Sequence, residues 1–312
     1  MCGIAGIIYR NGGGEGSEHQ VGRDMTAMLQ AMKHRGPDST GYALYRGGGP
    51  DYVMHVKLSE PTDRDPDIEQ RMARQRGEVE RRIKAAGVKV HEIGEQERTM
   101  TVHFDFDGDL KAVADAVERV RYTEVLSLGR HLEIVKDLGD AETVSGEYRL
   151  GEFTGTHAIG HARMATESDV DIANAHPYWA YPFPDVAVVH NGQLTNFHDW
   201  RRRLTRAGHR FQSDCDSEII AVYLAEKMSQ GKSLEDAMHD SLEELDGVFT
   251  YICVTEDSLG VAKDMLGAKP LVLYEDDDVV ALASEEIAIR QVLDREIETH
   301  DPYEGTIKVW SR

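Results

Sequence analysis

The chain has 312 residues, of which 40% are hydrophobic and 29% are charged, and its formal net charge at pH 7 is −21. This length can bury the core of one large domain or of two ordinary ones, and the composition is typical of a soluble globular protein. The strongly negative charge argues against nucleic acid or an anionic membrane surface as a partner.

The N-terminal part opens with a cysteine at position 2 and a short apolar run, which predict a buried strand over residues 2–9. Apolar residues at helical spacing then predict a helix over residues 19–34. The Gly36-Pro37 pair ends this helix, and a short strand is expected at residues 42–45.

The sequence pattern changes after the glycine-rich segment 46–50. We expect a strand, a long charged helix, two strands, a helix and two more strands, over residues 52–58, 65–86, 88–93, 99–106, 110–121, 124–128 and 131–135. The order strand, helix, strand, strand, helix, strand is that of a split βαβ, or ferredoxin-like, unit. We therefore predict an inserted small α+β subdomain at 50–148; the alternative is an elaboration of the main sheet.

From residue 156 the pattern returns to short apolar strands and glycine-rich turns. A strand starting at His157 runs into a loop, and a second strand at 187–190 is expected to end in an Asn-Gly turn. Helices are predicted over 195–207, 214–228, 234–245 and 284–293, and strands over 249–255, 259–263, 270–274, 279–283 and 306–310. Many strands with few helices between them favour sheets covered by helices.

Three scattered cysteines, Cys2, Cys215 and Cys253, suit neither a disulfide framework nor a cluster ligand set, and we interpret the last two as core residues. His157 and His161 are four residues apart on a predicted strand, so we expect no metal site. The sequence shows no signal peptide and no stretch of ~20 apolar residues. These features favour a cytoplasmic protein without membrane association.

Cys2 has two interpretations. If Met1 is removed, one residue carries both a thiol and a free α-amine, whose reference pKa of about 7.7–8.0 makes it a good built-in base. The alternative is a small buried cysteine near a frayed end of the chain.

A series of short motifs decides between these interpretations. They are MCGIAGI at 1–7, HRGPDSTG at 34–41, GHARMATES at 160–168, HNGQLTN at 190–196, SDCDSEII at 213–220, LDGVFTY at 245–251, GAKPL at 267–271 and ASE at 283–285. In this order they resemble the N-terminal-nucleophile, or class II, glutamine amidotransferases.

The resemblance covers about residues 1–46 and 155–310, so we assign 1–49 and 149–312 to the amidotransferase domain. It implies an α+β fold, a four-layer αββα sandwich of two packed antiparallel sheets, to which the inserted α+β subdomain is added. It also implies that glutamine is the substrate and that its side-chain amide is hydrolysed. The mature Cys2 thiolate would attack the δ-carbonyl, its own α-amine would move the proton, and water would cleave a glutamyl thioester.

The motifs also imply roles for individual residues. Asn191 and Gly192 match the donors of the oxyanion hole, although an Asn-Gly pair alone would indicate only a hairpin turn. Arg163 matches the arginine that binds the substrate carboxylate, with a surface salt bridge as the alternative. Asp216 matches the acid that binds the substrate ammonium group, with a helix first-turn charge as the alternative.

Two further residues match the family less specifically. Thr166 matches a residue of the substrate pocket in the loop after Arg163. Arg35 matches an arginine that orders the loop around the nucleophile, and a purely structural role is an equal alternative.

The destination of the ammonia is a separate question. The chain ends soon after the last motif, so we expect a glutaminase subunit that serves separate synthase chains in a hetero-oligomer. Its RMATES variant, insert and length resemble the amidotransferase subunit of glutamate-synthase-like systems, including N-methylglutamate synthase. This implies no cofactor in this chain, with FMN and an iron–sulfur cluster in partner subunits. The alternatives are a stand-alone amidohydrolase acting on a γ-glutamyl amide and a non-catalytic regulatory subunit.

Overall fold

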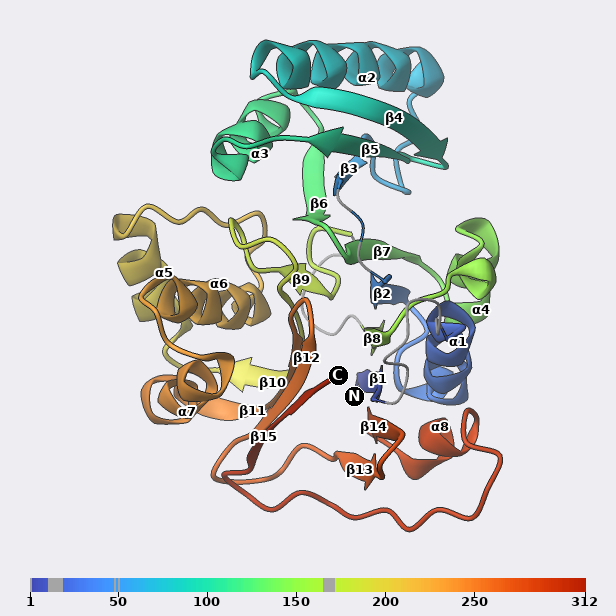
Figure 1. Ribbon diagram of the computed structural model, residues 1–312, viewed down its shortest axis with the longest axis vertical. Helices are drawn as coiled ribbons and strands as arrows, with labels where there is room; N and C mark the ends of the chain where they lie inside the picture. The colour runs from blue at the N-terminus through green and yellow to red at the C-terminus, as the bar shows by residue number, and fades with distance from the viewer. Residues whose placement is uncertain (1, 11–18, 48, 50, 165–171) are drawn as a thin grey trace.

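Two facing antiparallel sheets form the centre of the protein (Figure 1). The computed structural model describes residues 2–10, 19–47, 49, 51–164 and 172–312. The first sheet has the order β13-β14-β1-β8-β2-β7 and the second the order β15-β12-β11-β10-β9. The strands of the first sheet are β1 (Gly3–Tyr9), β2 (Ser39–Tyr45), β7 (Leu132–Leu138), β8 (His157–Arg163), β13 (Val272–Glu275) and β14 (Val279–Ala283). Those of the second are β9 (Tyr178–Trp179), β10 (Ala187–Leu194), β11 (Gly247–Val254), β12 (Ser258–Lys263) and β15 (Ile307–Ser311).

Helices cover the outer face of each of these sheets (Figure 1). The first sheet is covered by α1 (Val21–Ala31), α4 (Ala141–Glu147) and α8 (Glu286–Arg290). The second is covered by α5 (Phe197–Arg206), α6 (Asp216–Ser229) and α7 (Leu234–Glu244). The layers therefore run helix, sheet, sheet, helix, which confirms the predicted αββα sandwich. Short 3₁₀ turns at Lys33–Arg35 and Leu150–Glu152 complete the sandwich.

The apolar run after Cys2 is explained by the position of β1, which pairs with β14 on one side and β8 on the other. Ile4 and Ile8 pack into the core between the two sheets, whereas Ala5 and Ile7 pack on the side of α1. A strand buried on both faces needs apolar residues at every position. Full burial of each isoleucine contributes about 1.5–3 kcal/mol, so β1 holds Cys2 firmly at the edge of the core.

A third antiparallel sheet, with the order β4-β5-β3-β6, lies at one end of the molecule (Figure 1). It consists of β3 (Tyr52–Lys57), β4 (Lys89–Gln96), β5 (Thr99–Asp105) and β6 (Glu124–Gly129), with α2 (Ile68–Ala85) and α3 (Leu110–Glu118) packed against it. Along the chain these elements follow in the predicted order strand, helix, strand, strand, helix, strand.

The third sheet and its helices take up fewer residues, 52–129, than the predicted insert at 50–148. β7 and α4 lie within the range 50–148, but β7 pairs with β2 along its whole length and α4 packs beside α1. The predicted strand at 131–135 therefore belongs to the first sheet, as its edge. The division of the chain into domains at 50 and 148 stays a prediction.

One buried carboxylate fixes the point at which the chain leaves the third sheet. Asp185 accepts hydrogen bonds from the main-chain N–H groups of Arg130 (2.9 Å), His131 (2.8 Å) and Leu132 (2.9 Å), which connect β6 to β7. Charge-assisted bonds of this kind are about twice as strong as neutral ones. The third sheet is therefore held against the sandwich by a specific polar contact as well as by apolar packing.

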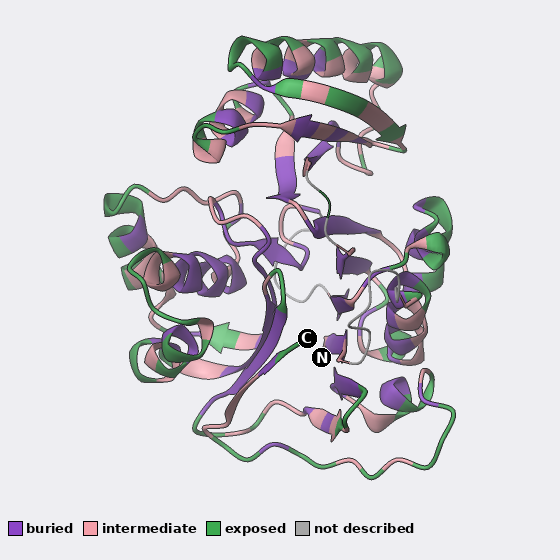
Figure 2. Cartoon of the chain, in the orientation of Figure 1, coloured by how far each residue is buried: buried purple, intermediate pink, exposed green. Residues whose placement is uncertain are grey.

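Burial follows the same layers (Figure 2). The inner strands of the two facing sheets are almost entirely buried, whereas the edge strands β13 and β15 are only partly buried and the outer side of α2 is exposed. One apolar cluster runs from the third sheet into the space between the other two. Among the described residues, no helix is long and apolar enough to cross a membrane.

Candidate active site

Cys2 lies where the strand register brings two predicted site residues together. Gly3 of β1 is paired with Ala162 of β8, so Cys2 is beside Arg163, which ends β8. The Cys2 Sγ atom lies 3.4 Å from the main-chain nitrogen of Met164 and 3.8 Å from its carbonyl oxygen. The thiol is only partly buried.

A cavity of about 510 Å³ opens at this point, in the size range of small-molecule sites. Its lining includes the predicted residues Cys2, Arg163, Asn191, Gly192 and Asp216. They come from β8, β10, the start of α6 and the segment before β1. The fold therefore brings together residues that are up to 214 positions apart in sequence.

Asn191 is in direct contact with the main chain of Cys2. Its Nδ2 atom donates to the Cys2 carbonyl oxygen at 2.8 Å and to Ser284 Oγ at 3.4 Å. Ser284 Oγ also accepts the N–H of Ile4 at 3.0 Å. Asn191 is 8% exposed, so its amide is held beside the nucleophile by buried contacts on two sides.

Gly192 does not lie in a hairpin turn, because β10 continues to Leu194. The alternative interpretation of the Asn-Gly pair, and the predicted end of this strand at residue 190, are therefore wrong. Gly192 has φ +142°, and a Cβ atom there would lie 2.0 Å from the carbonyl oxygen of Val248. Only glycine fits this position.

The pairing of β10 with β11 also sets the direction of the Gly192 main chain. Its partner Phe249 donates its N–H to the carboxylate of Asp264 and accepts the Asp264 N–H at 3.0 Å, both on the side away from β10. Gly192 and Phe249 are thus a pair without mutual hydrogen bonds, and the polar main-chain groups of Gly192 face the opposite edge of β10. This edge borders the cavity.

Asp216 is the first residue of α6, where its charge complements the helix dipole. Its Oδ2 atom accepts the N–H of Leu194 at 2.7 Å. The carboxylate therefore connects α6 to the strand that carries Asn191 and Gly192. Arg163, at 6% exposure, supplies a buried guanidinium to the same cavity.

Arg35 lies outside the residues that line the cavity. Its guanidinium pairs with Glu285, which His34 also contacts at 3.1 Å. The stem of Arg35 packs behind Gly3, where a Cβ atom would lie 3.5 Å from the Arg35 Cδ atom. This placement favours the structural role, as a support for the chain next to Cys2. Thr166 lies outside the described residues.

Sequence reasoning missed other residues of the cavity lining, among them three histidines and a second cysteine. His161, His176 and His190 line it, with the rings of His161 and His176 stacked at 4.0 Å between centroids. Cys215 lines it too and is only partly buried, so the interpretation of Cys215 as a core residue is wrong. His161 and His190 stand in the GHAR and HNG motifs, close to Arg163 and Asn191, and this position was the available signal. His176 lies in no motif.

Burial determines the protonation of these groups. It lowers the pKa of His161 to about 3, with His190 and Arg163 as further causes, and it lowers the pKa of His190 to about 4. His190 Nδ1 lies 2.7 Å from Ser217 Oγ. Burial raises the pKa of the Cys215 thiol, so this second thiol of the cavity stays protonated at neutral pH.

The buried histidines predict how stability depends on pH. In the unfolded chain a histidine titrates near 6.5, so below this pH the unfolded state takes up a proton that folded His161 rejects down to about pH 3. The free energy of unfolding then falls by up to ~1.4 kcal/mol per pH unit for each such group. In urea unfolding, His161→Gln should flatten this decline between about pH 6 and pH 4. The exposed His198→Gln is the matched control, and equal slopes for His161→Gln and wild type would show that buried His161 does not titrate in this way.

Comparisons with known proteins agree with this geometry. Residues 161–291 match the glutamine amidotransferase domain family. A protein named putative glutamine amidotransferase from Methanothermobacter thermautotrophicus is 38% identical over 99% of both chains. The glutamine amidotransferase-like protein GlxB of Rhizobium meliloti is 32% identical over 99% of this chain and 98% of its own.

A solved structure extends the similarity to the fold. The glutamine phosphoribosylpyrophosphate amidotransferase of B. subtilis superposes with a TM-score of 0.61 at 20% identity, over 99% of this chain and 47% of its own. This chain therefore spans about half the length of that enzyme. The solved structure shows the shared fold, and the full-length relatives show that the chain belongs to the glutamine amidotransferase family and is an enzyme of this kind.

Proposed function

We propose that Cys2 hydrolyses the side-chain amide of glutamine and that the ammonia passes to a synthase on separate chains. The observation that carries the first part is the shared cavity of Cys2, Arg163, Asn191, Gly192 and Asp216. It supplies a nucleophile, two oxyanion donors and two opposite charges in one place. A zwitterionic amino acid needs such a pair of charges for its carboxylate and ammonium groups.

The chemistry balances with the residues present. After removal of Met1, the α-amine of Cys2 takes the thiol proton and the thiolate attacks the δ-carbonyl. The tetrahedral intermediate collapses when the same ammonium group donates its proton to the departing ammonia. Water, deprotonated by the amine, then attacks the glutamyl thioester, which releases glutamate and restores the thiol.

Asn191 and Gly192 stabilise the oxyanion in this scheme. The shorter bond of the Asn191 amide, to the Cys2 carbonyl oxygen, holds the side chain in place. The 3.4 Å contact of the Asn191 amide with Ser284 is longer and therefore weaker. The Asn191 N–H that makes this contact is the one that turns to the negative charge developing on the substrate oxygen. The N–H of Gly192, on the cavity edge of β10, is the second donor.

The acceptor of the ammonia is the finer part of the proposal. The relatives that match over their whole length are named as amidotransferases alone, whereas the phosphoribosylpyrophosphate enzyme extends well beyond the matched region. On the motif resemblance, we propose a cytoplasmic hetero-oligomer with glutamate-synthase-like partners, such as those of N-methylglutamate synthase. FMN and an iron–sulfur cluster would then belong to the partner chains.

Co-purification from the native host tests this part. We expect the tagged chain to bring down synthase subunits with a flavin absorption spectrum, and the complex to use glutamine where the synthase chains alone need free ammonia. A Cys2→Ala complex should assemble equally well and use only ammonia. Recovery of the chain alone, with full glutaminase activity, would favour a stand-alone amidohydrolase instead.

A further inference from the structure

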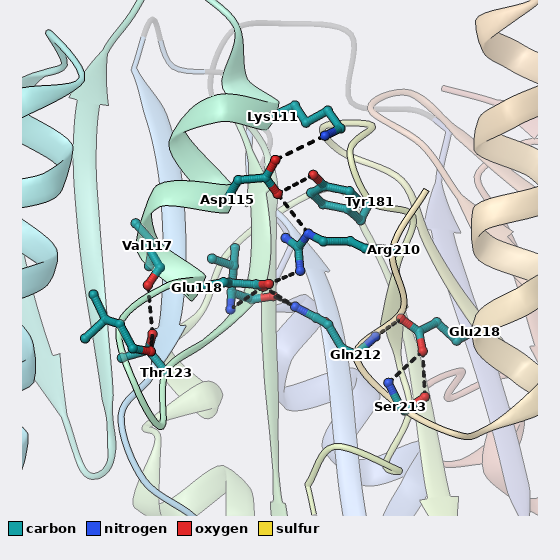
Figure 3. A network of polar contacts seen from close by, with 12 residues as sticks. Lys111, Asp115, Val117, Glu118, Thr123, Tyr181, Arg210, Gln212, Ser213 and Glu218 are labelled. Atoms are coloured by element: carbon teal, nitrogen blue, oxygen red, sulfur yellow. Dashed lines mark hydrogen bonds and ion pairs between the residues drawn. The ribbon is translucent and has the colours of Figure 1, made fainter. Parts of the chain in front are cut away.

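A set of polar contacts connects α3, which packs against the third sheet, to the start of α6 (Figure 3). It begins at Asp115 and Glu118, which are three residues apart and lie on one face of α3. Asp115 Oδ1 accepts the hydroxyl of Tyr181 at 2.5 Å and Arg210 Nε at 3.0 Å. Glu118 accepts hydrogen bonds from the guanidinium of Arg210 and from the side-chain amide of Gln212.

The same segment is bound to α6 by a buried carboxylate. Glu218, 4% exposed, accepts the main-chain N–H of Gln212 at 2.8 Å, the N–H of Ser213 at 2.9 Å and the hydroxyl of Ser213 at 2.7 Å. The Ser213 hydroxyl oxygen in turn accepts the N–H of Cys215 at 3.2 Å. Burial raises the pKa of Glu218, and these donors oppose that effect.

Asp216 stands at the end of this set of contacts. It follows Cys215 directly and lies two residues before Glu218, so the path of residues 212–215 fixes where α6 begins. Asp216 Oδ2 accepts the N–H of Leu194 at 2.7 Å, and Oδ1 accepts the Ser217 hydroxyl at 3.3 Å and the Cys215 thiol at 3.7 Å. A shift of the segment would therefore turn the Asp216 carboxylate relative to Asn191 and Gly192 across the cavity.

We propose that Glu118 and Gln212 are positioning residues for glutamine: acting through residues 210–215, they hold Asp216 where it pairs with the α-ammonium group of the substrate. This inference rests on the proposed function of the cavity. It makes the third sheet part of the glutamine-binding machinery, since one side of the arrangement comes from α3. The apolar core of this sheet is also continuous with that of the sandwich.

The test uses Glu118→Ala and Gln212→Ala in the full-length chain. We expect each to raise KM for glutamine about tenfold and to leave kcat within about twofold, because the ammonium contact is the same in the ground state and the transition state. Glutaramate, which is glutamine without the α-amine, should keep its inhibition constant. Glu80→Ala, on α2 of the same region, is the matched control and should change none of these constants.

A double-mutant cycle adds a second readout. Asp216→Asn should weaken glutamine binding by itself, and adding Glu118→Ala should then have little further effect, because both changes act on the same contact. A cavity of about 440 Å³ adjoins Glu118 and Gln212, so water can replace the truncated side chains. If thermal unfolding nevertheless shows that Glu118→Ala is unfolded, the KM for glutamine of Gln212→Ala, which removes no charge, tests the positioning role.

Two results would overturn the inference. One is an unchanged KM for glutamine in both variants. The other is an equal rise in KM for glutamine and in the inhibition constant of glutaramate, which would indicate a general distortion of the cavity. A wild-type protein without glutaminase activity would contradict the proposed function instead, before the positioning role is tested.

Discussion

Replacing Cys2 by alanine should abolish glutamine hydrolysis, with kcat falling on the order of 10⁴-fold or more. The change removes the nucleophile, and the remaining cavity supplies only binding and oxyanion stabilisation. Alanine retains the small volume next to Gly3 and β1, so the fold should be unaffected. Ammonia release from glutamine, measured with purified protein, gives the result directly.

Two other thiols make the experiment specific. Cys253→Ala is the control for thiol loss, because this side chain is buried in β11 and does not line the cavity. Cys215→Ala removes the second thiol of the cavity. Burial raises the pKa of this thiol and so keeps it protonated. If Cys215→Ala were inactive while Cys2→Ala turned over glutamine, the nucleophile would be misassigned.

Asn191→Ala should reduce kcat by about 10²–10³, which corresponds to about 2.7–4 kcal/mol for one oxyanion donor. KM should change little, because the donor acts on charge that develops only in the transition state. Steady-state kinetics of the purified variant, with its thermal unfolding as a check of folding, separate these effects.

Asn196→Ala is the matched control for this variant. Its amide donates to the Glu244 carbonyl oxygen at 2.9 Å and accepts the Asp246 N–H at 3.1 Å, outside the cavity. The control should therefore lose stability but keep its kcat. An Asn191→Ala enzyme with wild-type kcat would remove Asn191 from the oxyanion hole.

The place of most strands could be predicted because the apolar pattern of β1, β8 and β11 reflects burial on both faces, whereas the αββα sandwich followed from the motif resemblance. The motifs identified five cavity residues since each carries chemistry that the family needs. The course of β10 was missed because an Asn-Gly pair normally indicates a turn, and here Gly192 continues a strand at positive φ. No local signal could show that β7 joins the first sheet.

Most of the site features that could not be predicted from the sequence depend on long-range contacts. Glu118 and Gln212 are 94 residues apart, and neither belongs to a motif. His176 reaches the cavity from the segment before β9, where sequence periodicity says nothing about which side chains meet. Arg35 stands in a motif, but only the structure shows that it pairs with Glu285 and supports Gly3 from behind.

In the proposed reaction Cys2, as the first residue of the mature chain, forms a thioester with the glutamyl group. Acid quenching during turnover, followed by peptide mass analysis, tests it most directly. We expect an N-terminal peptide that begins at Cys2 and carries a glutamyl group on that residue. A fully active enzyme whose N-terminal peptide retains Met1, or a glutamyl group found on Cys215, would contradict it.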